Sequence, residues 1–142
     1  PGVASTSYWT LKNVGSLPGK LDILKTDLVD NDNLCPEPEA DAPSSDVTCG
    51  SVGGGELSAN MLVTIFVDVN FDGVVDLGDG DVVLFGPALL STLPATVATG
   101  IDLPAGAEKF ISFNWSIPGT TGNIIQSDST ELDLSFVLNQ AP

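Results

Sequence analysis

Residues 110–117 read FISFNWSI, and residues 132–138 read LDLSFVL. Apolar and polar side chains alternate through both stretches. The apolar positions are Ile111, Phe113, Trp115 and Ile117 in the first stretch and Leu132, Leu134, Phe136 and Leu138 in the second. Successive side chains of a β-strand point to opposite faces of its sheet, so this period of two predicts two strands that each turn one face to a core.

Four more stretches predict strands around this pair. They are residues 8–14, 20–29, 61–69 and 81–85. Residues 61–69 (MLVTIFVDV) are apolar on both faces, which indicates a central strand covered on both sides. One short helix is predicted at residues 87–93, with proline at its first position. The whole pattern predicts one all-β domain over residues 1–142, an antiparallel β-sandwich or jelly-roll of roughly seven strands.

Residues 68–79 read DVNFDGVVDLGD and have the spacing of an EF-hand-type calcium loop. The predicted ligands are the side chains of Asp68, Asn70, Asp72, Asp76 and Asp79 and the backbone carbonyl of Val74. Glycine at the sixth position permits the sharp turn. Asp79 replaces the usual glutamate, which predicts weaker binding or another ligand such as Asp81. The alternative is a hairpin turn rich in Asp and Gly, with solvated carboxylates.

The chain carries 19 acidic residues and four lysines, for a formal net charge of −15. Four lysines cannot neutralise a run of phosphates, so nucleic acid and anionic membrane surfaces are excluded as partners. Hydrophobic residues make up 42% of the chain and fall in periodic runs, so we expect a folded rather than a disordered protein. The acidic stretch at residues 30–46 is a second candidate cation site, although it follows no spacing rule.

The two cysteines, Cys35 and Cys49, flank a segment rich in Pro, Glu, Asp and Ser. Two cysteines that bracket such a loop predict a disulfide if the compartment is oxidising. A zinc site is disfavoured, because the chain has no histidine and only two thiols. No signal peptide or membrane-spanning run is found, and the start at Pro1 agrees with removal of a targeting segment from an extracellular protein.

Catalytic motifs are missing from the sequence. Without histidine there is no Ser–His or Cys–His nucleophile, and no P-loop, GxSxG or GxGxxG motif followed by a helix is found. The Asp residues stand in turn-like contexts rather than in the apolar pocket that a general acid needs. We therefore expect a protein that is not an enzyme.

Asn114 begins an N-glycosylation sequon, Asn-Trp-Ser. It lies on the polar side of its predicted strand, so a glycan would point away from the core. Chance occurrence in a strand rich in serine is the alternative.

Three segments resemble the TasA/camelysin family, especially its archaeal members. They are WTLKNVGSLPGKLDI at residues 9–23 after the initial Pro-Gly, NLCPEPEAD with CGSVGGGELSANMLVTIFVD at residues 33–41 and 49–68, and FNWSIPGTTGNIIQSDSTELDLSFVLNQ at residues 113–140. Within the third, the Gln-Ser-Asp run at residues 126–128 is expected to cap turn backbone groups. Some family members carry a metalloprotease label, which a chain without histidine does not support.

The resemblance implies a secreted β-sandwich that builds bundling pili or the fibres of a biofilm matrix. It also implies assembly between identical subunits by donor-strand complementation, in which an N-terminal strand enters the sheet of the neighbour. The family's usual strand before the Pro-Gly pair is missing here, which predicts a sheet edge or groove for a partner to fill.

Two function classes follow from the sequence. The first is a structural subunit of an extracellular filament, stapled by calcium and a disulfide. The alternative is a secreted, calcium-dependent binding module, either dockerin-like or carbohydrate-binding. A dockerin needs two such loops, each followed by a helix, whereas this chain has one loop followed by a predicted strand.

Overall fold

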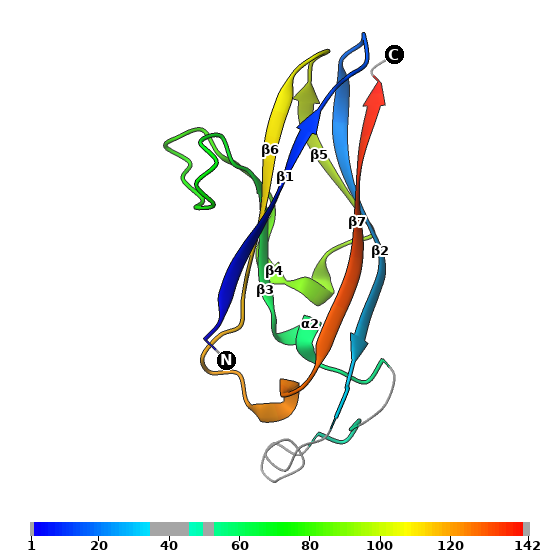
Figure 1. The fold of residues 1–142 in the computed structure, drawn as a ribbon, viewed down its shortest axis with the longest axis vertical. Helices are drawn as coiled ribbons and strands as arrows, with labels where there is room; N and C mark the ends of the chain where they lie inside the picture. Colours follow the sequence, from blue (N-terminus) through cyan, green and yellow to red (C-terminus); the bar gives the residue numbers. More distant parts are fainter. Residues whose placement is uncertain (1, 35–45, 50–52, 141–142) are drawn as a thin grey trace.

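The computed structural model describes residues 2–34, 46–49 and 53–140, which form two packed antiparallel sheets (Figure 1). The first sheet has the strand order β1-β6-β3-β4, and the second has the order β5-β2-β7. The strands are β1 (Ala4–Lys12), β2 (Gly19–Asn31), β3 (Leu62–Val67), β4 (Val82–Leu89), β5 (Thr96–Leu103), β6 (Glu108–Ser116) and β7 (Ser129–Gln140). This architecture confirms the predicted all-β antiparallel sandwich.

Strands β6 and β3 are the two interior strands of the first sheet, and β3 lies within residues 61–69, which were predicted to form a central strand. Strand β6 turns one face to the core, as its alternating sequence predicts. It pairs with β1 on one side and with β3 on the other. Ile111 of β6 and Ile65 of β3 are completely buried, and Phe113 lies opposite Ile65 in the register. Burying each such side chain contributes about 1.5–3 kcal/mol, so this inner face is a main source of stability.

Strand β2 is the centre of the second sheet. Its apolar residues Leu21 and Ile23 are buried and lie opposite Leu138 and Phe136 of β7. The alternation of residues 132–138 therefore places their apolar side chains toward the first sheet, as predicted.

The helix predicted at residues 87–93 is wrong. Strand β4 continues to Leu89, and its backbone pairing with β3 aligns Ala88 with Val63 and Leu89 with Leu62. Only a short 3-10 turn follows, η1 (Leu90–Thr92), in which Leu90 is buried in the core. Packing against the sheet thus overrides the helix signal. The remaining helical elements in the described residues are α2 (Leu57–Asn60) and η2 (Asn123–Ile125).

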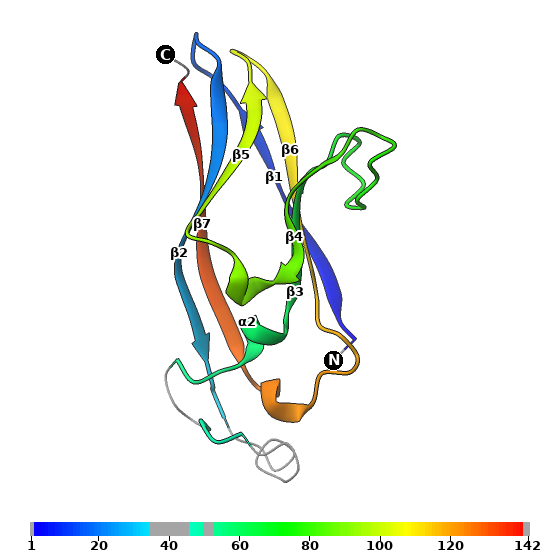
Figure 2. The same cartoon turned by 180° about the vertical axis from the view of Figure 1, so that it is seen from behind.

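The two open sides of the sandwich differ. Behind the sandwich, the chain crosses from the first sheet to the second through β4, η1 and β5 (Figure 2). On the front, the edge strands β1 and β7 face each other, and each pairs with only one neighbour in the described part of the chain (Figure 1). Among the described residues, no helix has the length and apolarity to cross a membrane.

Candidate functional site

The predicted calcium loop connects the paired strands β3 and β4 and projects from the side of the first sheet (Figure 1). Strands rather than helices flank it on both sides. Asp68, its first residue, is completely buried and accepts hydrogen bonds from the Ser112 hydroxyl at 2.7 Å and the Gly73 backbone N–H at 2.8 Å. A third and longer bond, 3.2 Å, comes from the backbone N–H of Asp72. Asp68 therefore fixes the first half of the loop to β6.

Asp81 fixes the other half. It is buried, and its two carboxylate oxygens accept hydrogen bonds from the backbone N–H groups of Val69 at 2.8 Å and Asp76 at 2.9 Å. The residue considered above as an additional calcium ligand thus joins the two ends of the loop. Sequence spacing gives no sign of this contact, because the donors are backbone groups.

The exposed ligand positions come together only in part. The side-chain amide of Asn70 donates hydrogen bonds to the carboxylates of Asp72 and Asp79, both at 3.0 Å. An ion between these carboxylates would require Asn70 to turn its amide oxygen toward them. Asp76 instead accepts a hydrogen bond from the Gly78 N–H at 2.7 Å. The loop supplies oxygen ligands of the right kind, and calcium binding stays a prediction.

The loop lies against the outer face of the first sheet. The ring of Phe71 contacts Tyr8 at a centroid distance of 5.0 Å and Phe110 at 4.7 Å. The Asn114 side chain donates a hydrogen bond to the Gly73 carbonyl at 3.1 Å and accepts one from the Thr6 hydroxyl at 2.7 Å. The sequon asparagine is therefore covered by the loop, so a glycan on its amide would displace these contacts.

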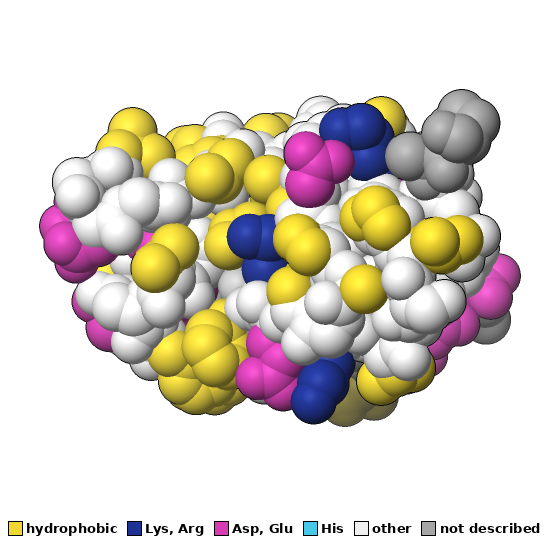
Figure 3. Space-filling view, turned by 90° about the horizontal axis from the view of Figure 1, so that it is seen from above, with side chains coloured by type: hydrophobic (Ala, Val, Ile, Leu, Met, Phe, Trp, Pro, Cys, Tyr) yellow, Lys and Arg dark blue, Asp and Glu magenta, His cyan; other side chains and the backbone are white. Residues whose placement is uncertain are grey.

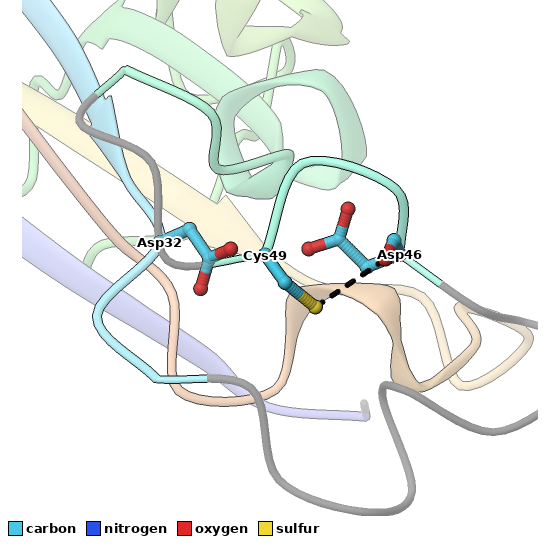
Figure 4. Close-up of side chains that lie close together, drawn as sticks. All are labelled: Asp32, Asp46 and Cys49. Atoms are coloured by element: carbon cyan, nitrogen blue, oxygen red, sulfur yellow. Dashed lines mark hydrogen bonds between the residues drawn. The ribbon is translucent and has the colours of Figure 1, made fainter.

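A second acidic cluster lies just beyond the C-terminal end of β2. Ligand atoms of Asp32, Asp46 and Cys49 all lie within 4.8 Å of one another (Figure 4). In the described residues, this is the only such group of three or more Asp, Glu, Cys or His side chains. The Cys49 sulfur lies 3.3 Å from the backbone carbonyl oxygen of Asp46. Cys35 lies outside the described residues, so its disulfide with Cys49 stays a prediction.

Two further carboxylates border this cluster. The Glu56 backbone N–H donates a hydrogen bond to Asp128 at 2.7 Å, as expected if the 126–128 run caps a turn. The Thr48 hydroxyl lies 2.7 Å from a carboxylate oxygen of Asp46 and 2.8 Å from one of Glu56. One hydroxyl proton cannot serve both carboxylates at once, so Asp46 and Glu56 compete for it.

Burial, hydrogen bonds and neighbouring charges shift the pKa values of the carboxyl groups in this cluster. Burial raises the pKa of Glu56, and the charges of Asp46 and Asp128 raise it further, against the lowering effect of the Thr48 hydrogen bond. Burial also raises the pKa of Asp128, against the hydrogen bond from the Glu56 backbone. The Thr48 hydrogen bonds lower the pKa of Asp46. Charge at Glu56 and Asp128 is therefore unfavourable in the folded state.

Glu56→Gln is expected to raise the melting temperature at neutral pH by a few degrees. A raised folded-state pKa means that the folded protein binds the proton more tightly than the unfolded chain. The stabilisation from this group is complete below its unfolded pKa and is lost as the pH rises through its folded pKa. Glutamine keeps an acceptor for Thr48 and removes the charge.

Melting curves in chelator, from acidic to neutral pH, test this expectation. The difference between variant and parent should shrink as the pH falls. The matched change Glu131→Gln, at an exposed position of β7, should have almost no effect. A variant that is less stable than the parent at neutral pH would contradict the proposed repulsion.

A third feature is an apolar groove on the open front of the sandwich, between β1 and β7. One part, of about 360 Å³, is lined by Ser7, Trp9, Phe113, Trp115, Leu132, Asp133 and Leu134. A second part, of about 430 Å³, extends it past Trp115 and Leu132 to Met61 and Ile117. Trp9 and Trp115 are only half-buried there. We call this the front groove; the sequence suggested such a feature only through the family resemblance.

Comparison with models of known protein families gives no match, and comparison with curated proteins gives none either. The TasA/camelysin resemblance therefore rests on the sequence segments quoted above.

Proposed function

We propose that the protein is a non-catalytic structural subunit of an extracellular filament, of the bundling-pilus or biofilm-matrix kind. Copies assemble when a β-strand of one subunit enters the front groove of its neighbour. The observation that carries this proposal is the outer edge of β7, which pairs with no strand among the described residues, beside a groove lined by half-buried Trp9, Trp115, Leu132 and Leu134.

An added strand would meet both needs of this site. Its backbone would pair with the outer edge of β7, where an edge strand presents N–H and C=O groups that no other described strand binds. Every second side chain would point into the groove and cover the tryptophans. The expected donor is therefore an extended segment with alternating large apolar residues, supplied by another copy of the chain.

Negative-stain microscopy of the concentrated protein, with light scattering across a dilution series, tests the proposal. Filaments of uniform width should form above a threshold concentration. Strictly monomeric protein at high concentration, with calcium present, would contradict it.

We further propose that the loop at residues 68–79 binds calcium as a rigid staple. Strands on both sides of the loop support this role, because a calcium sensor needs flanking helices that can open. Binding only to the folded state should stabilise it by about 2.7 kcal/mol at a hundredfold excess of calcium over Kd. Melting temperature should therefore rise with calcium and fall in chelator.

Asp79→Asn should remove this calcium response and leave the melting temperature in chelator nearly unchanged. Asp27→Asn is the matched control, with the same loss of charge at an exposed position of β2. Its left-handed backbone, φ 54°, is one that asparagine also adopts. A melting temperature that changes with neither calcium nor chelator would contradict the proposal that bound calcium stabilises this loop.

The alternative of a dockerin-like module gains no support from the loop, because β4 follows it where a dockerin has a helix. A secreted, oxidising location remains part of the filament proposal, together with the Cys35–Cys49 disulfide. Peptide mapping without reductant would detect that bond.

A further inference from the structure

The two ends of the long axis differ in charge and shape. At the upper end, the loops at residues 13–18 and 104–107 contain no charged side chain. Val14 is 88% exposed and Leu17 is 52% exposed, so the tip is apolar. Three of the four lysines stand just below it, namely Lys12, Lys20 and Lys109. Figure 3 shows apolar side chains and lysines on this end, with acidic side chains beside the lysines.

The lower end is acidic and hollowed. It holds five carboxylates, from Asp30, Asp32, Asp46, Glu56 and Asp128, and no lysine among its described residues. Beside them lies a pocket of about 390 Å³. Its apolar walls are Leu57, Ile117 and Ile125, and Asp128 stands at its side. We call this the end pocket.

We propose that the apolar tip of one copy, Val14 with Leu17, seats in the end pocket of a second copy. Lys12 and Lys109 then face the carboxylates of that copy. The inference rests on the proposed filament function and adds the surface by which successive subunits meet end to end.

Charge selects this pairing over the others. The lower end and the projecting loop, with Asp72, Asp76 and Asp79, are both acidic and repel each other. At the upper end, Asp102 pairs with Lys20 at 2.8 Å, and Lys12 lies opposite Glu108. With Asp22 and Lys109 the acids and lysines there are equal in number, so this end is close to neutral, whereas the lower end holds five carboxylates and no described lysine. An acidic end can therefore approach the upper end with less repulsion than it would meet at the lower end or the projecting loop.

The geometry of this contact leads to open chains. A knob on one end and a pocket on the other form a heterologous contact, which repeats without closing when the two lie at opposite ends of an elongated molecule. The same contact therefore fits a filament and not a symmetric dimer.

The double variant Val14→Asp/Leu17→Asp tests the contact, with Val83→Asp as the matched control. All three residues are exposed, so the folded monomer should tolerate each change. The double variant should raise the concentration needed for half-maximal association by at least about tenfold, from lost apolar burial and added repulsion. The control, on the edge strand β4 and outside the calcium loop, should associate like the parent.

Zero-length carbodiimide cross-linking of a mixture of light and heavy isotope-labelled chains gives a second readout. We expect mixed-isotope links from Lys12 or Lys109 to lower-end carboxylates. Filaments that lack these links, and that form normally from the double variant, would overturn the end contact and leave the filament proposal standing. Short chains that carry these links but never form filaments would support the end contact and overturn the filament proposal. If neither cross-links nor filaments form, both proposals are overturned.

Discussion

Ser7→Arg is expected to abolish filament formation without unfolding the subunit. Ser7 is an exposed residue of β1 that lines the front groove beside Trp9 and faces Leu132 and Leu134 across it. An arginine there would occupy the groove and place a charge where an incoming strand buries apolar side chains. Electron microscopy and sedimentation should show at least a hundredfold loss of polymer, because about 2.7 kcal/mol or more of contact free energy is removed.

Thr10→Arg is the matched control for this change. Thr10 lies on the same strand and is also exposed, but it alternates with Trp9 and so points to the outer face of the sheet. As monomers, both variants should have a free energy of unfolding within about 0.5 kcal/mol of the parent value. Equal loss of polymer in both variants would indicate a general effect of charge on β1. Normal filaments from Ser7→Arg would show that the front groove takes no part in assembly.

The sequence predicted six of the seven strands that the described residues form, most directly the two with a strong period of two and also the uniformly apolar stretch at residues 61–69. Residues 110–117 and 132–138 alternate cleanly, and both lie within strands that bury one face. Strand β5 (Thr96–Leu103) was missed, since its small and polar residues alternate weakly and its inner face contributes only half-buried side chains before Leu103. The false helix at residues 87–93 shows the same limit, because pairing with β3 is a long-range contact that local preference does not encode.

The candidate sites also differ in how far the sequence could predict them. Spacing alone located the loop at residues 68–79, since its ligand positions are local in sequence. The acidic cluster joins Asp128 to Glu56, which are 72 positions apart, and only the pairing of the sheets brings them together. The front groove likewise combines β1 with β7. The acidic stretch at residues 30–46 pointed to Asp32 and Asp46 of the cluster, but the addition of Glu56 and Asp128 and the front groove could not be derived without the strand arrangement.

Asp68→Ala is expected to lower the free energy of unfolding by about 3–5 kcal/mol. The carboxylate is completely buried and accepts hydrogen bonds from Ser112, Gly73 and Asp72. Alanine would leave these donors without an acceptor inside the fold, at about 1–3 kcal/mol for each unsatisfied group. Chemical denaturation in excess chelator measures the change, so that lost calcium binding does not contribute to it.

Substitution of Ser112, a hydrogen-bond donor to Asp68, helps to separate the structural role of Asp68 from its predicted role as a calcium ligand. Ser112→Ala removes one donor and keeps the carboxylate, so it should cost only about 1 kcal/mol and leave the calcium response intact. Asp68→Ala should lose stability in chelator and the calcium response together, whereas Asp79→Asn should lose the response alone. If Asp68→Ala and Asp79→Asn were equally stable in chelator, the buried carboxylate would not be what holds the loop to β6. The loop would then depend on its ring contacts with Tyr8 and Phe110 instead.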